Sequence, residues 1–241
     1  MATDGIGYNQ SQVVEVVENM KGALNSLKTA MQDNWPTMVS TFRTSWVGED
    51  EAGFEKTFSD EIKKMYQNCD LVSITAIRFI VDAANNWADW QSNVSTQFGG
   101  ATVAQLEIDI PQEDTLDITV DEQTFGQDVD RGLTDAGAEQ NLITAIDDYV
   151  NNVKTSFDNV YGEIQTSAAF IGSEQAGAMD EFVHGLSESM KQVLTMVDSF
   201  KTETIPELVK AYASQQTQVA TDAGTASSTI NDSVSGIGSA Q

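Results

Sequence analysis

Apolar residues recur at spacings of three and four along most of this 241-residue chain, and this periodicity constrains the fold more than any other feature. The first run consists of Val13, Val17, Met20, Leu24, Leu27, Met31, Trp35, Met38 and Phe42, and a second leads from Phe58 to Trp90. Each run predicts a helix of more than about 30 residues, roughly 50 Å long. Because only a short turn joins them, residues 1–97 are expected to form an antiparallel helical hairpin.

The turn itself contains Trp46-Val47-Gly48 and then three acidic residues. We expect Trp46 to close the end of the apolar seam, and Gly48 to adopt the left-handed backbone by which many helices end. Residues 49–51 would begin the next helix, where carboxylates interact favourably with free amides and with the helix dipole.

The second half of the chain repeats the first. The segment VKTSFDNVY (residues 153–161) aligns with LKTAMQDNW (27–35), and FIGSEQAGAMDEF (170–182) aligns with WVGEDEAGFEKTF (46–58). Agreement that includes the turn is more specific than agreement of helical seams alone. The repeat predicts two copies of one structural unit.

In the second copy, Phe170 and Gly172 stand where the first has Trp46 and Gly48. Apolar runs surround this turn as well: Leu142, Ile146, Tyr149, Val153, Phe157, Val160 and Ile164 before it, and Phe182, Leu186, Met190, Val193, Val197 and Phe200 after it. Residues 134–220 are therefore expected to form a second hairpin.

The second helix of the first hairpin is apolar around most of its circumference, through Leu71, Ile74, Ile77, Ile80 and Val81 besides its seam. Such a helix is buried on two sides. We therefore expect an all-α fold, in which the two antiparallel hairpins pack as a pseudo-dimeric four-helix bundle.

The connecting segment, residues 98–133, has a different pattern. Apolar and polar residues alternate on both sides of Pro111, which predicts a small β-hairpin whose shared apolar face is Leu106, Ile108, Ile110, Leu116, Ile118 and Val120. A two-stranded hairpin is marginal alone in water, so this face must be covered. Two interpretations stay open: an ordered linker packed on the helices, or strands that pair with another chain.

Near the C-terminus, Pro206 removes a helical amide donor, so the fourth helix is expected to kink or restart around Thr204. Residues 221–241 are rich in Ser, Thr, Ala and Gly, which is typical of a weakly ordered tail. The tail is either a flexible end or a segment that orders on a partner.

Charge excludes several function classes. Twelve Lys and Arg residues stand against 37 Asp and Glu, and the net charge of −25 repels nucleic acids and anionic membranes but suits a basic partner. The N-terminal sequence lacks the pattern of a secretory signal peptide, and no apolar run approaches the roughly 18 residues of a membrane span.

Residues suited to catalysis or cofactor binding are scarce. The single cysteine, Cys69, excludes an intramolecular disulfide, and the single histidine, His184, is expected on the solvent face of its helix. Residues 128–139 carry acids at calcium-loop spacing, but Leu133 stands where that loop requires glycine. We expect no catalytic site, no metal and no cofactor.

A hairpin of about a hundred residues with Trp46-Val47-Gly48 in its turn resembles the WXG family of small proteins secreted by type VII (ESX) machinery. The likeness would cover roughly residues 8–97, and, with Phe170 and Gly172 in the turn, residues 134–220. It implies four-helix bundles of paired hairpins, export without a signal peptide, and action by binding rather than catalysis.

The export signal of the resembled family, Tyr-X-X-X-Asp/Glu after the hairpin, is matched here only within a helix, by Tyr66 and Asp70. The resemblance implies a secreted or cell-surface protein whose partner is another helical-hairpin protein, the secretion machinery or a further copy of itself. The alternative function is a structural subunit of a surface filament or phage assembly, which the unpaired strands of the connecting segment motivate.

Overall fold

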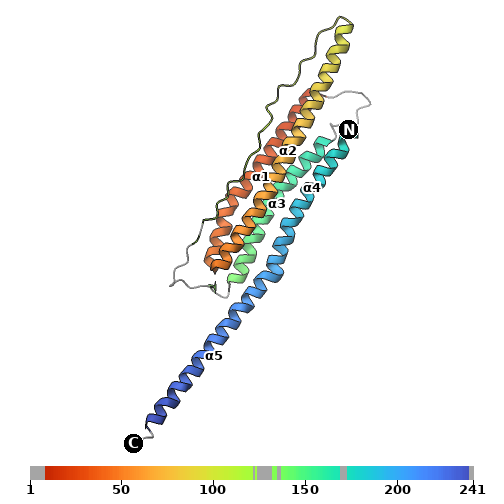
Figure 1. Cartoon of the computed structure of the whole chain (residues 1–241). Helices are drawn as coiled ribbons and strands as arrows, with labels where there is room; N and C mark the ends of the chain where they lie inside the picture. Colours follow the sequence, from red (N-terminus) through yellow and green to blue (C-terminus); the bar gives the residue numbers. More distant parts are fainter. Residues whose placement is uncertain (1–8, 122, 124–131, 135–136, 169–172, 239–241) are drawn as a thin grey trace.

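Helices dominate the computed structural model, which describes residues 9–121, 123, 132–134, 137–168 and 173–238 (Figure 1). The expected all-α class is confirmed. The elements in chain order are α1 (Gln10–Ser45), β1 (Trp46–Val47), α2 (Glu49–Gln97), β2 (Gly132–Leu133), α3 (Ala138–Ala168), α4 (Ser173–Ser199), the π-helix η1 (Phe200–Thr204) and α5 (Ile205–Gly238).

The first four α-helices lie side by side in an elongated molecule (Figure 1). Helix α1 contacts α2 and, more extensively, α3, whereas α4 contacts α2 and α3. The α1–α2 turn lies at one end, which we call the turn end, and α5 projects beyond it. At the opposite end the C-terminal part of α2 extends past its neighbours.

The core follows the predicted apolar period in three of the four helices. All nine seam residues of α1 are buried, as are the seam residues from Leu142 to Ile164 in α3 and from Leu186 to Val197 in α4. On the second apolar side of helix α2, Ile74, Ile77, Ile80 and Val81 are buried as expected, but the prediction for Leu71 is wrong because it is 52% exposed. On the seam, Trp90 is 55% exposed, and the C-terminal part of this 49-residue helix extends beyond the helices that could cover it.

The expected interruption at Pro206 is present. Helix α4 passes into η1, and the amide of Ile205 bonds to the carbonyl of Phe200, five residues back. A proline cannot donate to the helical ladder and crowds the preceding turn, and the wider π-turn accommodates it. Beyond it α5 stays helical to Gly238, so the backbone of residues 221–238 is helical where a weakly ordered tail was expected.

The predicted β-hairpin in the connecting segment is wrong. Residues 101–121 contain no strand, and the only sheet among the described residues pairs β1 with β2, with Trp46 opposite Leu133. Residues 101–121 instead run as a single chain along α1 and α2 (Figure 1). We call them the extended segment.

Helix side chains take the place of the missing second strand. From α2, Asn85 accepts the amide of Leu106 at 2.7 Å, and Asp70 accepts that of Asp114 at 2.8 Å. From α1, the indole of Trp35 donates to the carbonyl of Thr119 at 3.1 Å. The same backbone groups would be costly to bury without partners, so these bonds allow one extended chain to lie on helices.

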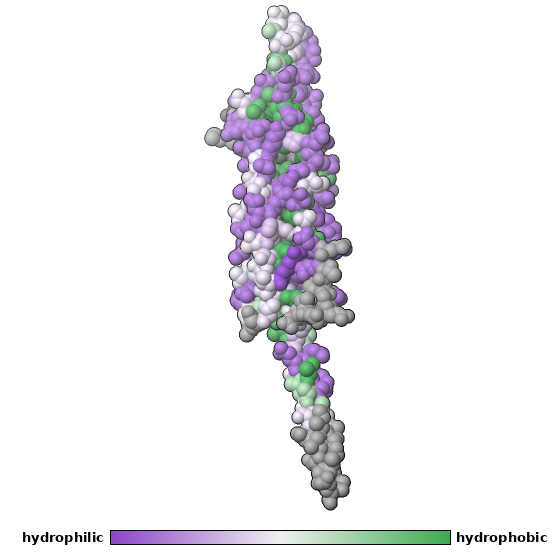
Figure 2. Space-filling view, turned by 90° about the vertical axis from the view of Figure 1, so that its left-hand side faces the viewer, coloured by the Kyte–Doolittle hydropathy of each residue, from purple (hydrophilic) through white to green (hydrophobic). Residues whose placement is uncertain are grey.

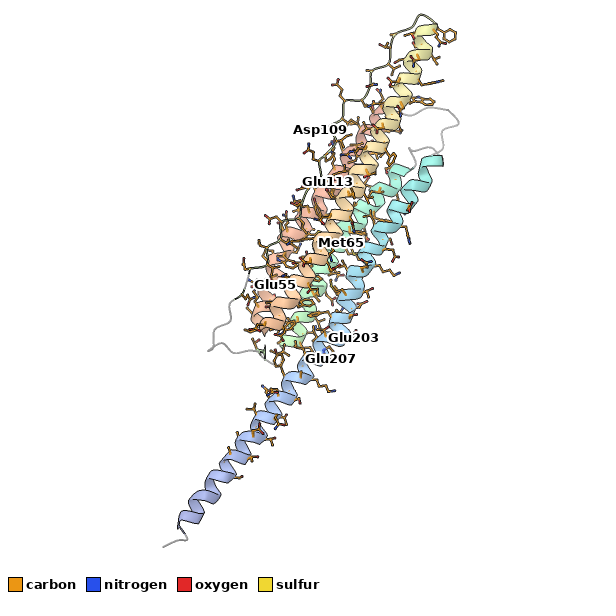
Figure 3. All side chains as sticks on the ribbon, viewed as in Figure 1. Glu55, Met65, Asp109, Glu113, Glu203 and Glu207 are labelled. Atoms are coloured by element: carbon orange, nitrogen blue, oxygen red, sulfur yellow. The ribbon has the colours of Figure 1, made fainter. Side chains whose placement is uncertain are left out.

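The alternating pattern that suggested a hairpin has another cause. Leu116 and Ile118 are buried, and Leu106, Ile108, Ile110 and Val120 are half-buried, all against the helical core. Asp109 and Glu113 lie on the outer side of the segment (Figure 3). Of the two interpretations left open by the sequence, the structure agrees with the ordered linker packed on the helices.

The buried role of the extended segment can be tested with a neighbouring pair of residues. Ile118→Ala should lower the free energy of unfolding by about 2–4 kcal/mol, because it opens a void in a packed site. Thr119→Ala, at an exposed side chain, should change it by no more than about 0.5 kcal/mol. Urea unfolding followed by circular dichroism measures both, and equal effects would contradict this packing.

Candidate functional site at the turn end

Aromatic rings from both halves of the chain stack at the turn end. Phe54 of α2 lies 4.0 Å from Phe200 of η1 and 5.5 Å from Phe42 of α1, measured between ring centroids. Trp46 closes the stack at 6.4 Å from Phe200 and is 2% exposed. Trp46 is thus buried at the end of the apolar seam. We call Phe42, Trp46, Phe54 and Phe200 the aromatic cluster.

Asp50 joins this turn to α5. Its Oδ2 atom accepts hydrogen bonds from Trp46 Nε1 at 3.1 Å and from the hydroxyl of Tyr212 at 2.9 Å. Burial, and then the bond to the Asp50 carboxylate, raise the pKa of Tyr212, so the hydroxyl stays a donor. Asp50 lies in the first turn of α2, as the sequence predicts, and it also bridges the turn to α5.

The left-handed conformation predicted for Gly48 is wrong. Its φ of 162° is extended backbone and not left-handed. A Cβ atom on Gly48 would lie 2.3 Å from Asp50 Oδ1, so a side chain would displace the bridging carboxylate. Across the sheet, Gly132 has a φ of +129°, and a Cβ atom there would lie 3.2 Å from the ring of Tyr212. Both glycines thus leave room for the Asp50–Tyr212 bridge.

A second group of polar side chains lies beside the aromatic cluster. Arg43 Nη2 and Nε donate to the two carboxylate oxygens of Glu55, at 2.8 and 3.1 Å, and Glu55 is 2% exposed (Figure 3). Glu51 is fully buried next to it, and Gln123 Nε2 donates to Glu51 Oε2 at 3.3 Å. Burial, and then the charge of Glu55, raise the pKa of Glu51 to about 8. Glu51 is therefore mostly protonated at neutral pH, which makes the buried group tolerable.

The sequence-predicted residues do not all come together. Trp46 and Gly48 form the turn, whereas Phe170 and Gly172 lie outside the described residues. The two residues that match the export motif, Tyr66 and Asp70, lie in the middle of α2 and are 1% and 3% exposed.

The extended segment binds Asp70 of that motif. The Asp70 carboxylate accepts the backbone amide of Asp114, and the side chain of Asp114 forms an ion pair with Lys28. Recognition of the Asp70 carboxylate by another protein would thus require the extended segment to release it.

The residues with the greatest chemical reactivity lie apart from one another. His184 is exposed on α4, and Cys69 is fully buried in α2, where burial raises its thiol pKa to about 12. Leu133, which replaces the glycine of a calcium loop, belongs to β2. Within the described ranges, no three His, Cys, Asp or Glu side chains are placed to hold a metal ion.

Sequence reasoning missed the partners of the turn. Tyr212 lies 162 residues from Asp50, and no spacing links the two. Arg43 offered a weak signal, because it is one of only 12 basic residues and directly precedes the turn. Nothing in the sequence distinguishes Glu55 from the other acidic residues, of which the chain has 37 in all.

In comparisons with known proteins, no family model, curated protein or solved structure matches the chain. Among the described helices, none has both the length and the apolar content to cross a membrane.

Gly48→Ala should destabilise the protein by about 1–3 kcal/mol, because the new Cβ atom displaces the Asp50 carboxylate and breaks two hydrogen bonds. Gly53→Ala, at an exposed position of α2 with open space around it, should instead stabilise by about 0.5–1 kcal/mol. Thermal or urea unfolding distinguishes them. In an Asp50→Ala background the Gly48 effect should shrink; an undiminished effect would show that the carboxylate is not its cause.

Glu51→Gln should raise the free energy of unfolding above pH 8 by about 1–3 kcal/mol and change it little near pH 5. The unfolded chain releases this proton near the ordinary pKa of 4.5, whereas the folded protein holds it to about 8. The stabilising contribution is therefore complete below about pH 4.5 and is lost as the pH rises through 8.

The matched control for this experiment is Glu15→Gln, which removes one exposed acid from α1 and leaves the buried group intact. Urea unfolding of wild type and both variants at pH 5 and pH 9 gives the six values needed. Parallel pH profiles for wild type and Glu51→Gln would contradict a buried, protonated Glu51.

Proposed function

We propose that the chain is a non-enzymatic protein that acts by protein–protein binding, as a tandem WXG-like substrate or partner of type VII (ESX-like) secretion. The observation that carries the proposal is the turn end. Trp46 and Gly48 join two long helices there, Trp46 closes the aromatic cluster, and Gly48 makes room for Asp50. A Trp-X-Gly turn between two long helices is the feature on which the family resemblance is based.

The proposal includes a pseudo-dimeric four-helix bundle, with each hairpin standing for one member of a WXG pair. Its support is the set of neighbours: α1 lies against α3, and α2 against α4. Between the hairpins, Asn152 of α3 donates to Asn34 of α1 at 3.1 Å, and Asn68 of α2 donates to Ser189 of α4 at 3.0 Å. In this reading one chain supplies both members of the pair.

Binding rather than catalysis is favoured by the use of the polar groups at the turn end. Arg43 and Glu55 bind each other, and Asp50 bridges Trp46 and Tyr212. These are structural roles. Export without a signal peptide, to the cell surface or the surrounding medium, follows from the same resemblance. Since Tyr66 and Asp70 are covered, we propose that a partner carries the export signal.

The alternative function is a structural subunit of a surface filament or phage assembly. The unpaired β-hairpin that suggested this alternative is not formed, because residues 101–121 contain no strand. A different observation now favours it: α2 and α5 project from opposite ends of the elongated molecule, so each end offers a contact to a neighbour (Figure 1). Trp90 and Phe98, 55% and 86% exposed, lie toward the α2 end.

Export is tested in the source organism by probing culture supernatant in strains with and without the membrane ATPase of a type VII system. The proposal expects the protein outside wild-type cells and its retention in the ATPase deletion, with a cytoplasmic marker reporting lysis. Retention of the protein in both strains, or equal export with and without the ATPase, would contradict the proposal. Large particles that sediment from wild-type supernatant would instead support the structural subunit.

A further inference from the structure

Most of α5 extends away from the rest of the molecule (Figure 1). Its base is anchored by Ile205, which is fully buried, and by the bond from Tyr212 to Asp50. Every side chain from Ala213 to Ser228 is exposed. Residues 213–228 include six Ser and Thr residues, which are weaker helix formers than Ala, and a helix whose side chains are exposed gains little stabilisation from packing. A covering partner would supply the missing stabilisation.

One face of α5 has the spacing of a coiled-coil seam. Alternating steps of three and four residues connect Val209, Tyr212, Gln216, Val219, Ala223 and Ala226. Val219 is 57% exposed, and Figure 2 shows a hydrophobic patch on the projecting helix. This regular spacing selects a helix as the occupant, because a strand has a period of two.

A groove at the base of α5 continues the seam. It has a volume of about 440 Å³, and its lining includes Gly132 and Leu133 of β2 together with Tyr212, Val219 and Ala223 of α5. The lining is mainly apolar, and four of its members, Tyr212, Gln216, Val219 and Ala223, belong to the seam. The groove and the seam thus form one surface, from β2 along the projecting helix.

We propose that the occupant of this surface is α5 of a second copy, in an antiparallel pair. Charge is the first argument. Residues 211–238 contain only two charged side chains, Asp222 and Asp232, in a protein of net charge −25. Like-charge repulsion between two copies is therefore weakest along α5.

Charge also sets the orientation. A parallel pair would place two strongly acidic bodies side by side. In an antiparallel pair the bodies lie at opposite ends of a helix of 26 residues (213–238), about 39 Å apart and several times the Debye length of about 8 Å. The arrangement is two-fold symmetric, so the tip of each α5 approaches the groove of the other copy.

The contact area makes the dimer weak. A helix about 39 Å long and about 10 Å wide covers roughly 400 Å² on each partner, or roughly 800 Å² in total. Stable complexes usually bury about 1,200–2,000 Å². We therefore expect a dissociation constant in the micromolar range or above, and a dimer that strengthens with salt as the remaining repulsion is screened.

Sedimentation equilibrium of the full chain, from micromolar to millimolar concentration at low and high salt, tests the pair. Val219→Glu places a charge on the seam and should weaken dimerisation at least tenfold. Thr221→Glu adds the same charge on the opposite face of the helix and should change it by no more than about threefold. Circular dichroism checks that both variants fold. A wild-type monomer throughout, or equal effects of the two variants, overturns the proposal.

Orientation has its own measurement. A spin label at Ser214→Cys, near the base of α5, should give an intermolecular distance of about 30–40 Å in the antiparallel dimer. Cys69 is buried and does not compete for the label. A distance below about 20 Å would show a parallel pair and overturn the assignment. The dimer does not depend on export, so neither experiment decides the outcome of the other.

Discussion

The aromatic cluster at the turn end joins the two halves of the chain. Phe42, Trp46 and Phe54 come from the first hairpin, and Phe200 comes from η1, more than a hundred residues later. Because the rings stack, the turn, the start of α2 and the end of α4 have fixed relative positions. Those positions place Tyr212 within reach of Asp50 and direct α5 away from the helices.

Periodicity predicted the parts of the fold that depend on which side of an element is buried. The seams of α1 and α3 and the break at Pro206 follow from residue type and spacing alone. The same information misassigned the extended segment, because alternation indicates one buried face and does not identify the partner. Asn85 and Asp70, which bind its backbone, lie 21 and 44 residues away.

At the turn, the sequence predicts which residues lie there but not the long-range contacts that they make. Trp46 and Gly48 lie in the turn between α1 and α2, but the bridge from Asp50 to Tyr212 beside them has no counterpart in the local sequence pattern. No local pattern contains a contact across 162 residues. Buried acids are likewise invisible in a chain with 37 acidic residues, since only packing separates Glu51 and Glu55 from the surface acids.

The central claim, that stacked rings join the two halves, is tested most directly by a double-mutant cycle between Phe54 and Phe200. Their centroids are 4.0 Å apart, the shortest distance in the cluster. Urea unfolding of Phe54→Leu, Phe200→Leu and the double variant should give a coupling free energy of about 0.5–1.5 kcal/mol. Additive effects, with no coupling beyond the error of the measurement, would contradict the account.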